Sequence, residues 1–213
     1  MSHLPTASLG FHSRRLVRVL GAAAALLGVI GLTACAGDPL ADQYRAGSGK
    51  NYIAGDGTVT EIAPGNRGAP IVFSGETTQG DTYALADHRG SATVVNFWYA
   101  GCAPCRKEAP DLQAVFAQEL DRGRDVSFVG VNVRDQAATA AAFNQTFGVT
   151  YPALTDQNGA IQLAFASDVP PNAVPTTLVL DAEGRVAARV LGALADRSIL
   201  SALIDTVWAE TNP

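Results

Sequence analysis

The chain has 213 residues, of which 47% are hydrophobic and 16% charged, a balance typical of a globular domain and unlike that of a wholly disordered or fibrous protein. Its formal net charge is -5, and the first 34 residues hold three arginines and no acid, so the rest carries 12 basic against 20 acidic residues. This acidic body argues against a nucleic-acid partner, because phosphates attract basic surfaces. Of the three histidines only His88 lies beyond residue 34, which excludes most histidine-based chemistry.

Residues 1–34 have the organisation of an export signal, in which a stretch with three arginines precedes a charge-free run from 19 to 34. As a helix, these sixteen residues would rise about 24 Å, less than the ~30 Å of a bilayer core. A cleaved signal is therefore the preferred interpretation, and an uncleaved signal anchor is the alternative. Ser13-Arg14-Arg15 is similar to a twin-arginine signal, but Val17 and Arg18 depart from the apolar pair that follows in such signals.

The signal ends in Leu32-Thr33-Ala34-Cys35, which resembles the lipobox of bacterial lipoproteins. The resemblance implies that Cys35 receives a lipid and becomes the new N-terminus. Residues 35–68 then form a tether, because the stretch from 36 to 68 contains seven glycines and few large apolar side chains. Within it, the alternating segment Thr58–Ile62 is typical of a short edge strand. The folded domain is predicted to span residues 69–213.

From residue 69 onward, strand-like patterns alternate with helix-like patterns. Ile71–Phe73 and Thr82–Leu85 flank two glycines and predict a hairpin. The remaining predicted strands cover 93–99, 126–133, 151–154, 176–180 and 186–191, and the predicted helices cover 104–122, 136–147, 159–165 and 196–208. Strands separated by helices predict an α/β fold with a central sheet that is covered on both faces.

The most informative motif is Cys102-Ala103-Pro104-Cys105, which follows a predicted buried strand and opens a predicted helix. Two cysteines three residues apart lie on one helical face, close enough to form a disulfide. The first sulfur lies where the helix dipole and unpaired backbone N–H groups favour an anion, which lowers a thiol pKa. We therefore expect Cys102 to be the exposed nucleophile and Cys105 the resolving thiol.

Other interpretations of the cysteine pair fit the sequence less well. A structural zinc site would need two further ligands, and the exported body offers only Cys35 and His88. A structural disulfide usually closes a longer loop. Covalent haem attachment needs a histidine directly after the second cysteine, where Arg106 stands. No metal or other cofactor is expected.

The segment from Val94 to Pro110 around the cysteines resembles the active-site block of the TlpA/ResA group of thioredoxin-like proteins. The resemblance extends over residues 69 to 210 and includes three further stretches, 85–90, 151–156 and Val174-Pro175-Thr176-Thr177. It implies a thioredoxin-like fold, with a central mixed β-sheet, helices on both faces, an N-terminal β-hairpin and a central insertion. It also implies thiol-disulfide exchange on extracytoplasmic partners and a cis peptide bond before Pro175.

The comparison gives roles to three more residues. Pro175 lacks an N–H, and beside the cysteines it would leave the Val174 backbone free to pair with a bound peptide; the alternative is an ordinary loop proline. Glu108 follows Cys105 by three residues and could shuttle the proton of that thiol, unless it is a solvent-facing helix glutamate. Asn96 occupies the position of a buried acid in thioredoxins, which leaves Glu108 as the nearest candidate base.

The preferred function is that of a lipid-anchored thiol-disulfide oxidoreductase on the extracytoplasmic face of the bacterial cell membrane. We expect it to reduce disulfides of exported proteins, with apocytochrome c as a candidate, and to be recharged by a membrane thiol electron carrier. The expected reduction potential lies nearer the ~-270 mV of thioredoxin than the ~-120 mV of a strong oxidant. The alternatives are a disulfide-forming oxidase on the same fold and a non-catalytic lipoprotein binding module. A peroxidase is disfavoured because Tyr99 stands where peroxiredoxins carry a threonine.

Overall fold

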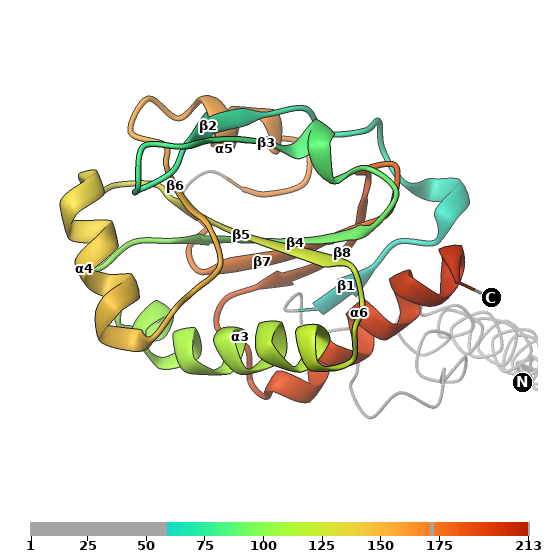
Figure 1. The fold of residues 1–213 in the computed structure, drawn as a ribbon. Helices are drawn as coiled ribbons and strands as arrows, with labels where there is room; N and C mark the ends of the chain where they lie inside the picture. Colours follow the sequence, from blue (N-terminus) through green and yellow to red (C-terminus); the bar gives the residue numbers. More distant parts are fainter. Residues whose placement is uncertain (1–58, 171–172, 213) are drawn as a thin grey trace, which may run out of the picture. The chain divides into compact units, whose positions relative to one another are not determined.

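A computed structural model describes residues 59–170 and 173–212. The predicted signal, Cys35 and the tether as far as residue 58 lie outside the described residues. The described chain is built on a six-stranded sheet with the strand order β1-β8-β7-β4-β5-β6 (Figure 1). These strands are β1 (Val59–Glu61), β4 (Ala92–Trp98), β5 (Val126–Asn132), β6 (Ala153–Thr155), β7 (Thr176–Leu180) and β8 (Val186–Leu191).

The sheet is mixed. Strands β4, β5 and β6 run parallel, whereas β7 pairs antiparallel with both β4 and β8, and β8 pairs antiparallel with β1. All seven residues of the central strand β4 are buried, which explains why its sequence is mostly apolar and does not alternate between apolar and polar residues. The parallel pair β4 and β5 requires a crossover connection, and helix α3 (Ala103–Asp121) provides it.

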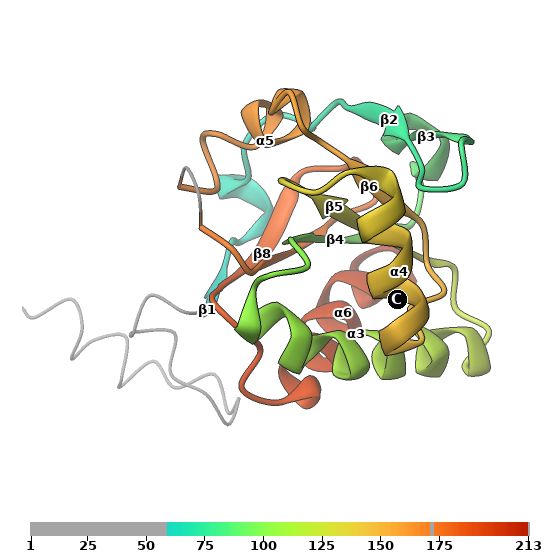
Figure 2. The same ribbon diagram turned by 90° about the vertical axis from the view of Figure 1, so that its left-hand side faces the viewer.

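Helices and a hairpin cover the two faces of the sheet. Helices α3 and α6 (Arg197–Thr211) lie side by side on one face, and α4 (Ala137–Phe147) lies beside the edge strand β6 (Figures 1 and 2). The other face carries the antiparallel pair β2 (Ser74–Glu76) and β3 (Thr82–Ala84) together with the short helix α5 (Ala160–Ala164). The predicted α/β architecture with helices on both faces and an N-terminal hairpin is therefore confirmed.

The sheet separates two hydrophobic clusters. Val94 of β4 packs with residues of α3 and α6, such as Leu112 and Leu203, on one face. Its neighbour Val95 points to the opposite face, where it packs with Phe73 before the hairpin and Ile161 of α5. This alternation follows from the two-residue period of a strand, and it makes β4 the common support of both clusters.

The observed elements depart from the predicted ones in the hairpin, at β6, which begins at Ala153 instead of residue 151, and at the last helix. The first hairpin strand is residues 74–76 instead of 71–73, although Ile71 and Phe73 are both buried. Because the backbone N–H of Leu85 donates to the carbonyl of Phe73, that segment is held to the hairpin without forming a strand. A four-residue 3-10 turn, Leu85–His88, replaces the end of the second predicted strand. Helix α6 extends to Thr211, three residues beyond the predicted end.

The last part of the predicted tether packs on the domain. The expected edge strand is present as β1, whose Val59 lies opposite Val190 of β8. After the 3-10 turn Pro64–Asn66, the guanidinium group of Arg67 donates to the Asp181 carboxylate at 2.9 Å, and both side chains are buried. Residues 59–67 therefore take part in the fold, ahead of the predicted domain start at residue 69.

Candidate functional site

The cysteine pair lies at the junction between β4 and α3. Cys102 is the N-cap residue of α3 and Cys105 lies in its first turn, so the helix period brings the two sulfur atoms together. They form a disulfide, with 5.2 Å between the Cα atoms. The Cys105 backbone N–H donates to the Cys102 sulfur at 3.2 Å, as expected for an atom at the start of a helix. Pro104 occupies the first turn, where its missing N–H removes no helical hydrogen bond.

The expectation that the first sulfur is the more exposed one is wrong for the disulfide form. Cys102 is 3% exposed and Cys105 is 2% exposed. Both residues belong to a cluster that contains Trp98 of β4 and Phe143 of α4, and this packing was not visible in the local sequence. The difference between the two sulfurs is therefore one of position on the helix, not of exposure.

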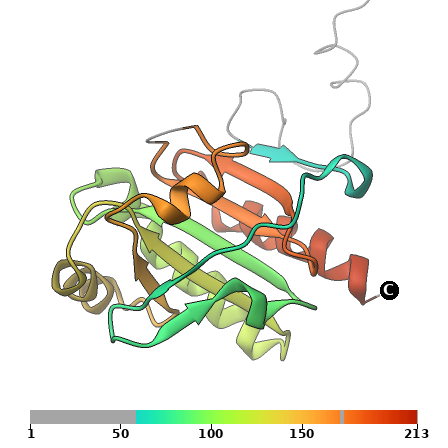
Figure 3. The ribbon, with the colours of Figure 1, turned by 90° about the horizontal axis from the view of Figure 1, so that it is seen from above.

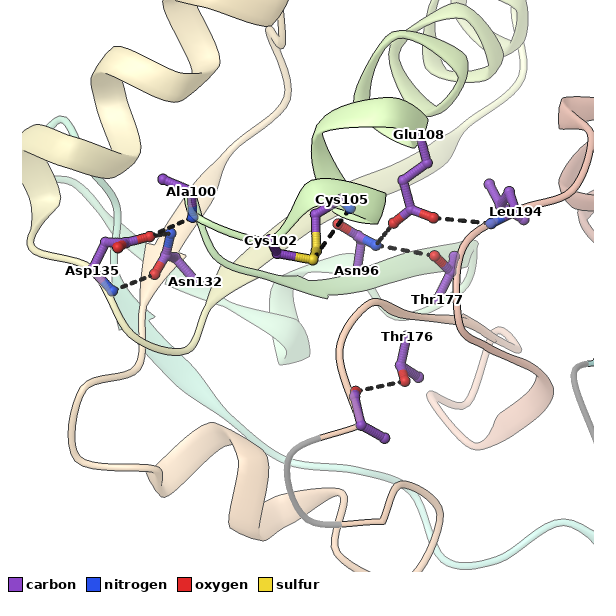
Figure 4. The surroundings of a disulfide bond; sticks show 11 residues. Asn96, Ala100, Cys102, Cys105, Glu108, Asn132, Asp135, Thr176, Thr177 and Leu194 are labelled. Carbon is purple, nitrogen blue, oxygen red and sulfur yellow. Dashed lines mark hydrogen bonds between the residues drawn. A yellow bond between two sulfur atoms is a disulfide. The ribbon is translucent and has the colours of Figure 1, made fainter.

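The loop that leads to Cys102 is fixed by the turn after β5. The Asp135 carboxylate oxygen Oδ2 accepts hydrogen bonds from the Ala100 backbone N–H at 2.6 Å and from the Asn132 amide at 2.9 Å (Figure 4). The Asn132 side-chain oxygen in turn accepts from the Asp135 backbone N–H at 2.7 Å. The Arg134 guanidinium lies over the Tyr99 ring, 4.1 Å from its centroid. The turn thus holds the segment between β4 and the cysteines at several points.

Sequence reasoning missed Asn132 and Asp135. A signal for them existed, because Asn132 lies at the end of a buried strand that was predicted to lie in the same sheet as β4, and Asp135 follows that strand. The carboxyl ends of parallel strands meet at one edge of a sheet, and Cys102 also follows such an end.

Glu108 is buried on the inner side of α3 and is not a solvent-facing helix residue. Its Oε1 accepts a hydrogen bond from the Asn96 amide at 3.1 Å, and its Oε2 accepts from the Leu194 backbone N–H at 3.0 Å (Figure 4). The same Asn96 amide donates to the Thr177 hydroxyl at 3.1 Å. Burial raises the pKa of Glu108 to about 7, and the hydrogen bonds from Leu194 and Asn96 oppose this rise.

The Val174–Pro175 peptide bond is cis, as the resemblance implies. The turn before it is fixed by the Thr176 hydroxyl, which donates to the Ala173 carbonyl at 2.8 Å, and the Gly192 N–H donates to the Pro175 carbonyl at 2.9 Å. The Val174 side chain packs against the cluster that contains both cysteines. Among the residues that the structure describes, no group hydrogen-bonds to the Val174 backbone N–H or carbonyl.

Of the predicted site residues, Cys102, Cys105 and Glu108 lie at the start of α3 or on it, and Val174, the residue before Pro175, packs against the cluster that contains both cysteines. Cys35 lies outside the described residues. Within residues 59–170 and 173–212, no group of three or more His, Cys, Asp and Glu side chains is arranged to hold a metal ion. No helix of the described chain is both long enough and apolar enough to cross a membrane.

Comparisons with known proteins agree with this geometry. The model of the AhpC/TSA family matches residues 67–189. The thiol:disulfide interchange protein HelX of Rhodobacter capsulatus is 31% identical over 149 residues, which are 70% of this chain and 76% of that protein. The thiol-disulfide oxidoreductase ResA of Bacillus subtilis is 32% identical over 124 residues, 58% of this chain and 66% of ResA.

A solved structure is similar over almost its whole length. The DsbF homologue of Corynebacterium diphtheriae has a TM-score of 0.62 and 35% sequence identity, and the match covers 73% of this chain and 96% of that chain. Together with the disulfide at the start of α3, these similarities show that the chain belongs to the AhpC/TSA family and is a thioredoxin-like thiol-disulfide oxidoreductase of the TlpA/ResA type.

Proposed function

We propose that this enzyme reduces disulfide bonds of exported proteins, with Cys102 as the attacking thiol and Cys105 as the resolving thiol. The observation that carries the proposal is the place of the cysteine pair, at the start of α3 and packed against Val174. In the reduced enzyme, the dipole of α3 and the Cys105 N–H favour a thiolate at Cys102.

The exchange takes two steps. The Cys102 thiolate attacks one sulfur of the substrate disulfide, so that the substrate S–S bond breaks, one substrate thiolate leaves, and a mixed disulfide forms. The Cys105 thiolate then attacks the Cys102 sulfur and releases the second substrate thiolate, which takes up a proton. The substrate gains two electrons, and the enzyme ends with the Cys102–Cys105 disulfide. A dithiol donor must return these two electrons, and we propose a membrane thiol carrier in this role.

Glu108 is proposed to take the proton from the Cys105 thiol. With its pKa near 7, its carboxyl group can accept and release a proton at neutral pH. Cys105 and Asn96, the hydrogen-bond donor to Glu108, line the same hollow of about 10 Å³ inside the protein. That volume is about the size needed for one water molecule, which would place a water beside Cys105 and Asn96 on the side of the site where Asn96 bonds to Glu108.

Pro175 is proposed to shape the surface that receives the substrate backbone. Proline offers no N–H of its own, and the Val174 backbone groups beside it have no partner among the described residues. An extended peptide can therefore pair with Val174 while its disulfide approaches Cys102. This proposal treats the substrate as an unfolded or flexible segment.

The proposed location is the extracytoplasmic face of the cell membrane, with residues 1–34 as the signal and a lipid on Cys35. Two similar structures are those of a secreted thiol-disulfide isomerase of Corynebacterium glutamicum and a secreted Mycobacterium tuberculosis disulfide oxidoreductase. Apocytochrome c is the proposed substrate, because it presents paired cysteines outside the membrane. Mass spectrometry should find a lipid-modified Cys35 and no residues 1–34; an intact N-terminus in the membrane fraction would instead establish a signal anchor.

Trapping of substrates tests the roles of the two cysteines. Cys105→Ser should accumulate mixed disulfides with exported proteins, because the resolving thiol is missing, whereas Cys102→Ser should not. The reverse result would exchange the two assignments.

The reduction potential of the cysteine pair tests whether the enzyme reduces or forms disulfides in the cell. A potential above about -150 mV, together with a fully oxidised population of the enzyme in the cell, would favour the disulfide-forming oxidase over the reductase.

A further inference from the structure

Two arginines with stacked guanidinium groups border the cluster around the cysteine pair. The Arg134 guanidinium lies 4.1 Å from the centroid of the Tyr99 ring, and the Arg106 guanidinium lies 5.8 Å from that of the Phe147 ring. Both rings pack against the cluster that contains the two cysteines. Helix α4, which ends at Phe147, lies at the end of the domain where β4 leads into α3 (Figures 1 and 3). The aromatic rings thus hold two cations at the edge of the reactive site.

Both stacks are also connected to the backbone of Cys102. The Cys102 N–H donates to the Tyr99 carbonyl at 3.1 Å, and the Arg106 N–H donates to the Cys102 carbonyl at 3.1 Å. Arg106 follows Cys102 by four residues, so the two side chains lie on the same face of α3. An extended polypeptide advances about 3.3 Å per residue. Side chains within a few residues of a cysteine that reacts with Cys102 can therefore reach the arginines.

The charges of these two arginines are not neutralised within the described chain. Arg106 and Arg134 are exposed, and no carboxylate among the described residues lies within ion-pair distance of either one. Asp135, next to Arg134, instead accepts hydrogen bonds from Ala100 and Asn132. Most other basic side chains of the described chain form ion pairs or donate to backbone carbonyls, namely Arg67, Arg89, Arg122, Arg124, Arg185 and Arg189.

We infer that Arg106 and Arg134 bind carboxylate groups of the substrate polypeptide, on residues that flank its reacting cysteine. The inference rests on the proposed function and adds a substrate class to it, a disulfide in an acidic segment. Stacking on a ring fixes the plane of a guanidinium group, whereas the N–H groups at its edge stay free to donate to the two oxygens of a carboxylate.

The charge of the whole protein makes the place of this attraction specific. Beyond residue 34 the chain carries 12 basic against 20 acidic residues, so its surface as a whole repels an acidic segment. Two exposed cations at the cysteine pair would attract such a segment at the one place where exchange can occur. Complementary charges of this kind favour the correct encounter and orientation more than they raise affinity.

The test uses the full-length reduced enzyme in detergent and short Gly/Ser peptides with one cysteine, oxidised as a mixed disulfide with 2-mercaptoethanol. Aspartate, asparagine and lysine are compared at each position near that cysteine. The measured quantity is the second-order rate constant for oxidation of the enzyme. Each value is divided by the rate constant of the same peptide with dithiothreitol, a thiolate without neighbouring cations. The ratio between two peptides for one enzyme variant is then independent of the reactivity of Cys102.

We expect aspartate at one or two positions to raise the normalised rate constant about three- to fivefold over asparagine at low ionic strength, the size typical of an exposed ion pair. Lysine should lower it. The preference should shrink at about 1 M salt, where charges are screened within about 3 Å. Arg106→Gln and Arg134→Gln should each reduce the preference, and the double variant should abolish it. Arg134→Lys keeps the charge without the planar group and should retain part of it.

Leu120→Glu is the matched control. It changes the net charge by one unit in the same direction as each glutamine variant, at an exposed position about 27 Å along α3 from Cys102. This variant should keep the full preference for aspartate. A loss of preference in Leu120→Glu equal to that in Arg106→Gln would show that net charge, and not the two arginines, governs the rate.

Two further results would overturn the inference. Equal normalised rate constants for aspartate and asparagine at every position would show that the arginines select nothing. An aspartate preference that persists in the double variant, or that salt leaves unchanged, would place the selecting contact elsewhere. In each of these cases exchange itself still occurs and the proposed function stands. An enzyme that exchanges with none of the peptides and not with hydroxyethyl disulfide would overturn both proposals together.

Discussion

The side-chain amide of Asn96 donates hydrogen bonds to Glu108 and to Thr177, both at 3.1 Å. Asn96 lies on β4, Glu108 on α3 and Thr177 on β7, so one amide group connects the helix that carries the cysteines with two strands of the sheet. All three residues are buried. An amide can supply the donors that a buried carboxylate and a hydroxyl need, whereas a second carboxylate in its place could not.

The first prediction is that Asn96→Asp destabilises the enzyme at high pH. Two carboxyl groups would share one buried site, and their mutual repulsion raises their pKa values above those in the unfolded chain. Groups with raised pKa values leave stability intact in acid and reduce it as the pH rises, so the loss should be about 2 kcal/mol or more at pH 8 and smaller at pH 4. Urea denaturation at the two pH values measures it.

The matched control for this charge change is Asn158→Asp. Asn158 is exposed, and its side-chain oxygen accepts from the Ala160 N–H, a bond that aspartate can also accept. The control should be as stable as the parent at both pH values. Equal losses in the two variants would contradict the argument from the buried carboxyl pair.

The second prediction concerns Glu108→Gln. The pKa of Glu108 is raised from 4.5 to about 7 by burial, so the unfolded chain ionises first as the pH rises, and the folded state loses up to about 3 kcal/mol of stability between pH 4 and pH 8. Glutamine does not ionise. Because its –NH2 group cannot accept one of the two N–H hydrogen bonds that the Glu108 carboxyl accepts, the variant should be less stable than the parent at pH 4, and this deficit should shrink or reverse at pH 8, as measured by urea denaturation.

The same variant also tests the proton-transfer role. The rate of peptide disulfide exchange should lose the component that titrates near pH 7 in the parent enzyme. Glu76→Gln, at an exposed position on the hairpin strand β2, is the control and should keep both the stability profile and the rate profile. A pH profile of exchange that Glu108→Gln leaves unchanged would remove Glu108 from the mechanism.

The sequence alone was sufficient to locate those strands whose hydrophobic pattern follows from their own burial. Strands β7 and β8 have the predicted bounds, and β4 and β5 differ from the predicted bounds by one residue, because a strand buried on both faces is apolar throughout. The first hairpin strand was misplaced by three residues because Ile71 and Phe73 are apolar for packing under the hairpin, not for pairing. Apolar character alone does not separate these two cases.

The cysteine motif could likewise be located from the sequence, but its surroundings could not. One of the two hydrogen bonds to the Glu108 carboxyl comes from the backbone of Leu194, which lies 86 residues further along the chain. The bond between Asp135 and Ala100 joins residues that are 35 apart. Such contacts depend on how strands and helices meet in space, so the helical spacing between Cys105 and Glu108 placed the glutamate on the correct helix without revealing that it is covered.

The third prediction concerns Asp135, which holds the loop before Cys102. Asp135→Ala removes the acceptor for the Ala100 N–H and the Asn132 amide and should lower the free energy of unfolding by about 1.5–3 kcal/mol. The freed loop should also change the rate at which Cys102 of the reduced enzyme is alkylated. Asp135→Asn keeps an acceptor oxygen. This variant should recover most of the lost stability and bring the alkylation rate of Cys102 most of the way back to that of the parent.

An outcome in which Asp135→Asn behaves like Asp135→Ala would show that the negative charge, rather than the hydrogen-bonded geometry, is what matters at this position. Asp125→Ala is the control. Its carboxylate accepts a hydrogen bond from Ser91 in an exposed pair ahead of the first residues of β4 and β5, and its loss should leave the alkylation rate unchanged.

The last prediction concerns Arg67, which ties the segment before the domain to the turn between β7 and β8. Its guanidinium lies 2.9 Å from the Asp181 carboxylate and 2.6 Å from that of Glu210, and the side chains of Arg67 and Asp181 are 2% and 3% exposed. Removing one partner of a buried ion pair leaves an uncompensated charge and costs ~3–5 kcal/mol. Asp181 keeps a second partner, Arg185, at 2.8 Å, so Arg67→Ala should cost about 3 kcal/mol.

The pH dependence and a matched variant distinguish this cost from a loss of packing. Burial alone would raise the pKa of Asp181, but hydrogen bonds from the Arg185 backbone and from Arg67 lower it. The ion pair therefore stabilises the folded state at pH values above the usual aspartate pKa, and this stabilisation is lost as the pH falls through the lowered pKa. The difference between Arg67→Ala and the parent should therefore shrink in acid. Arg185→Ala, which removes a more exposed arginine from the same carboxylate, should cost less, about 1 kcal/mol. A larger loss in Arg185→Ala than in Arg67→Ala would contradict the assignment of Arg67 as the main partner of Asp181.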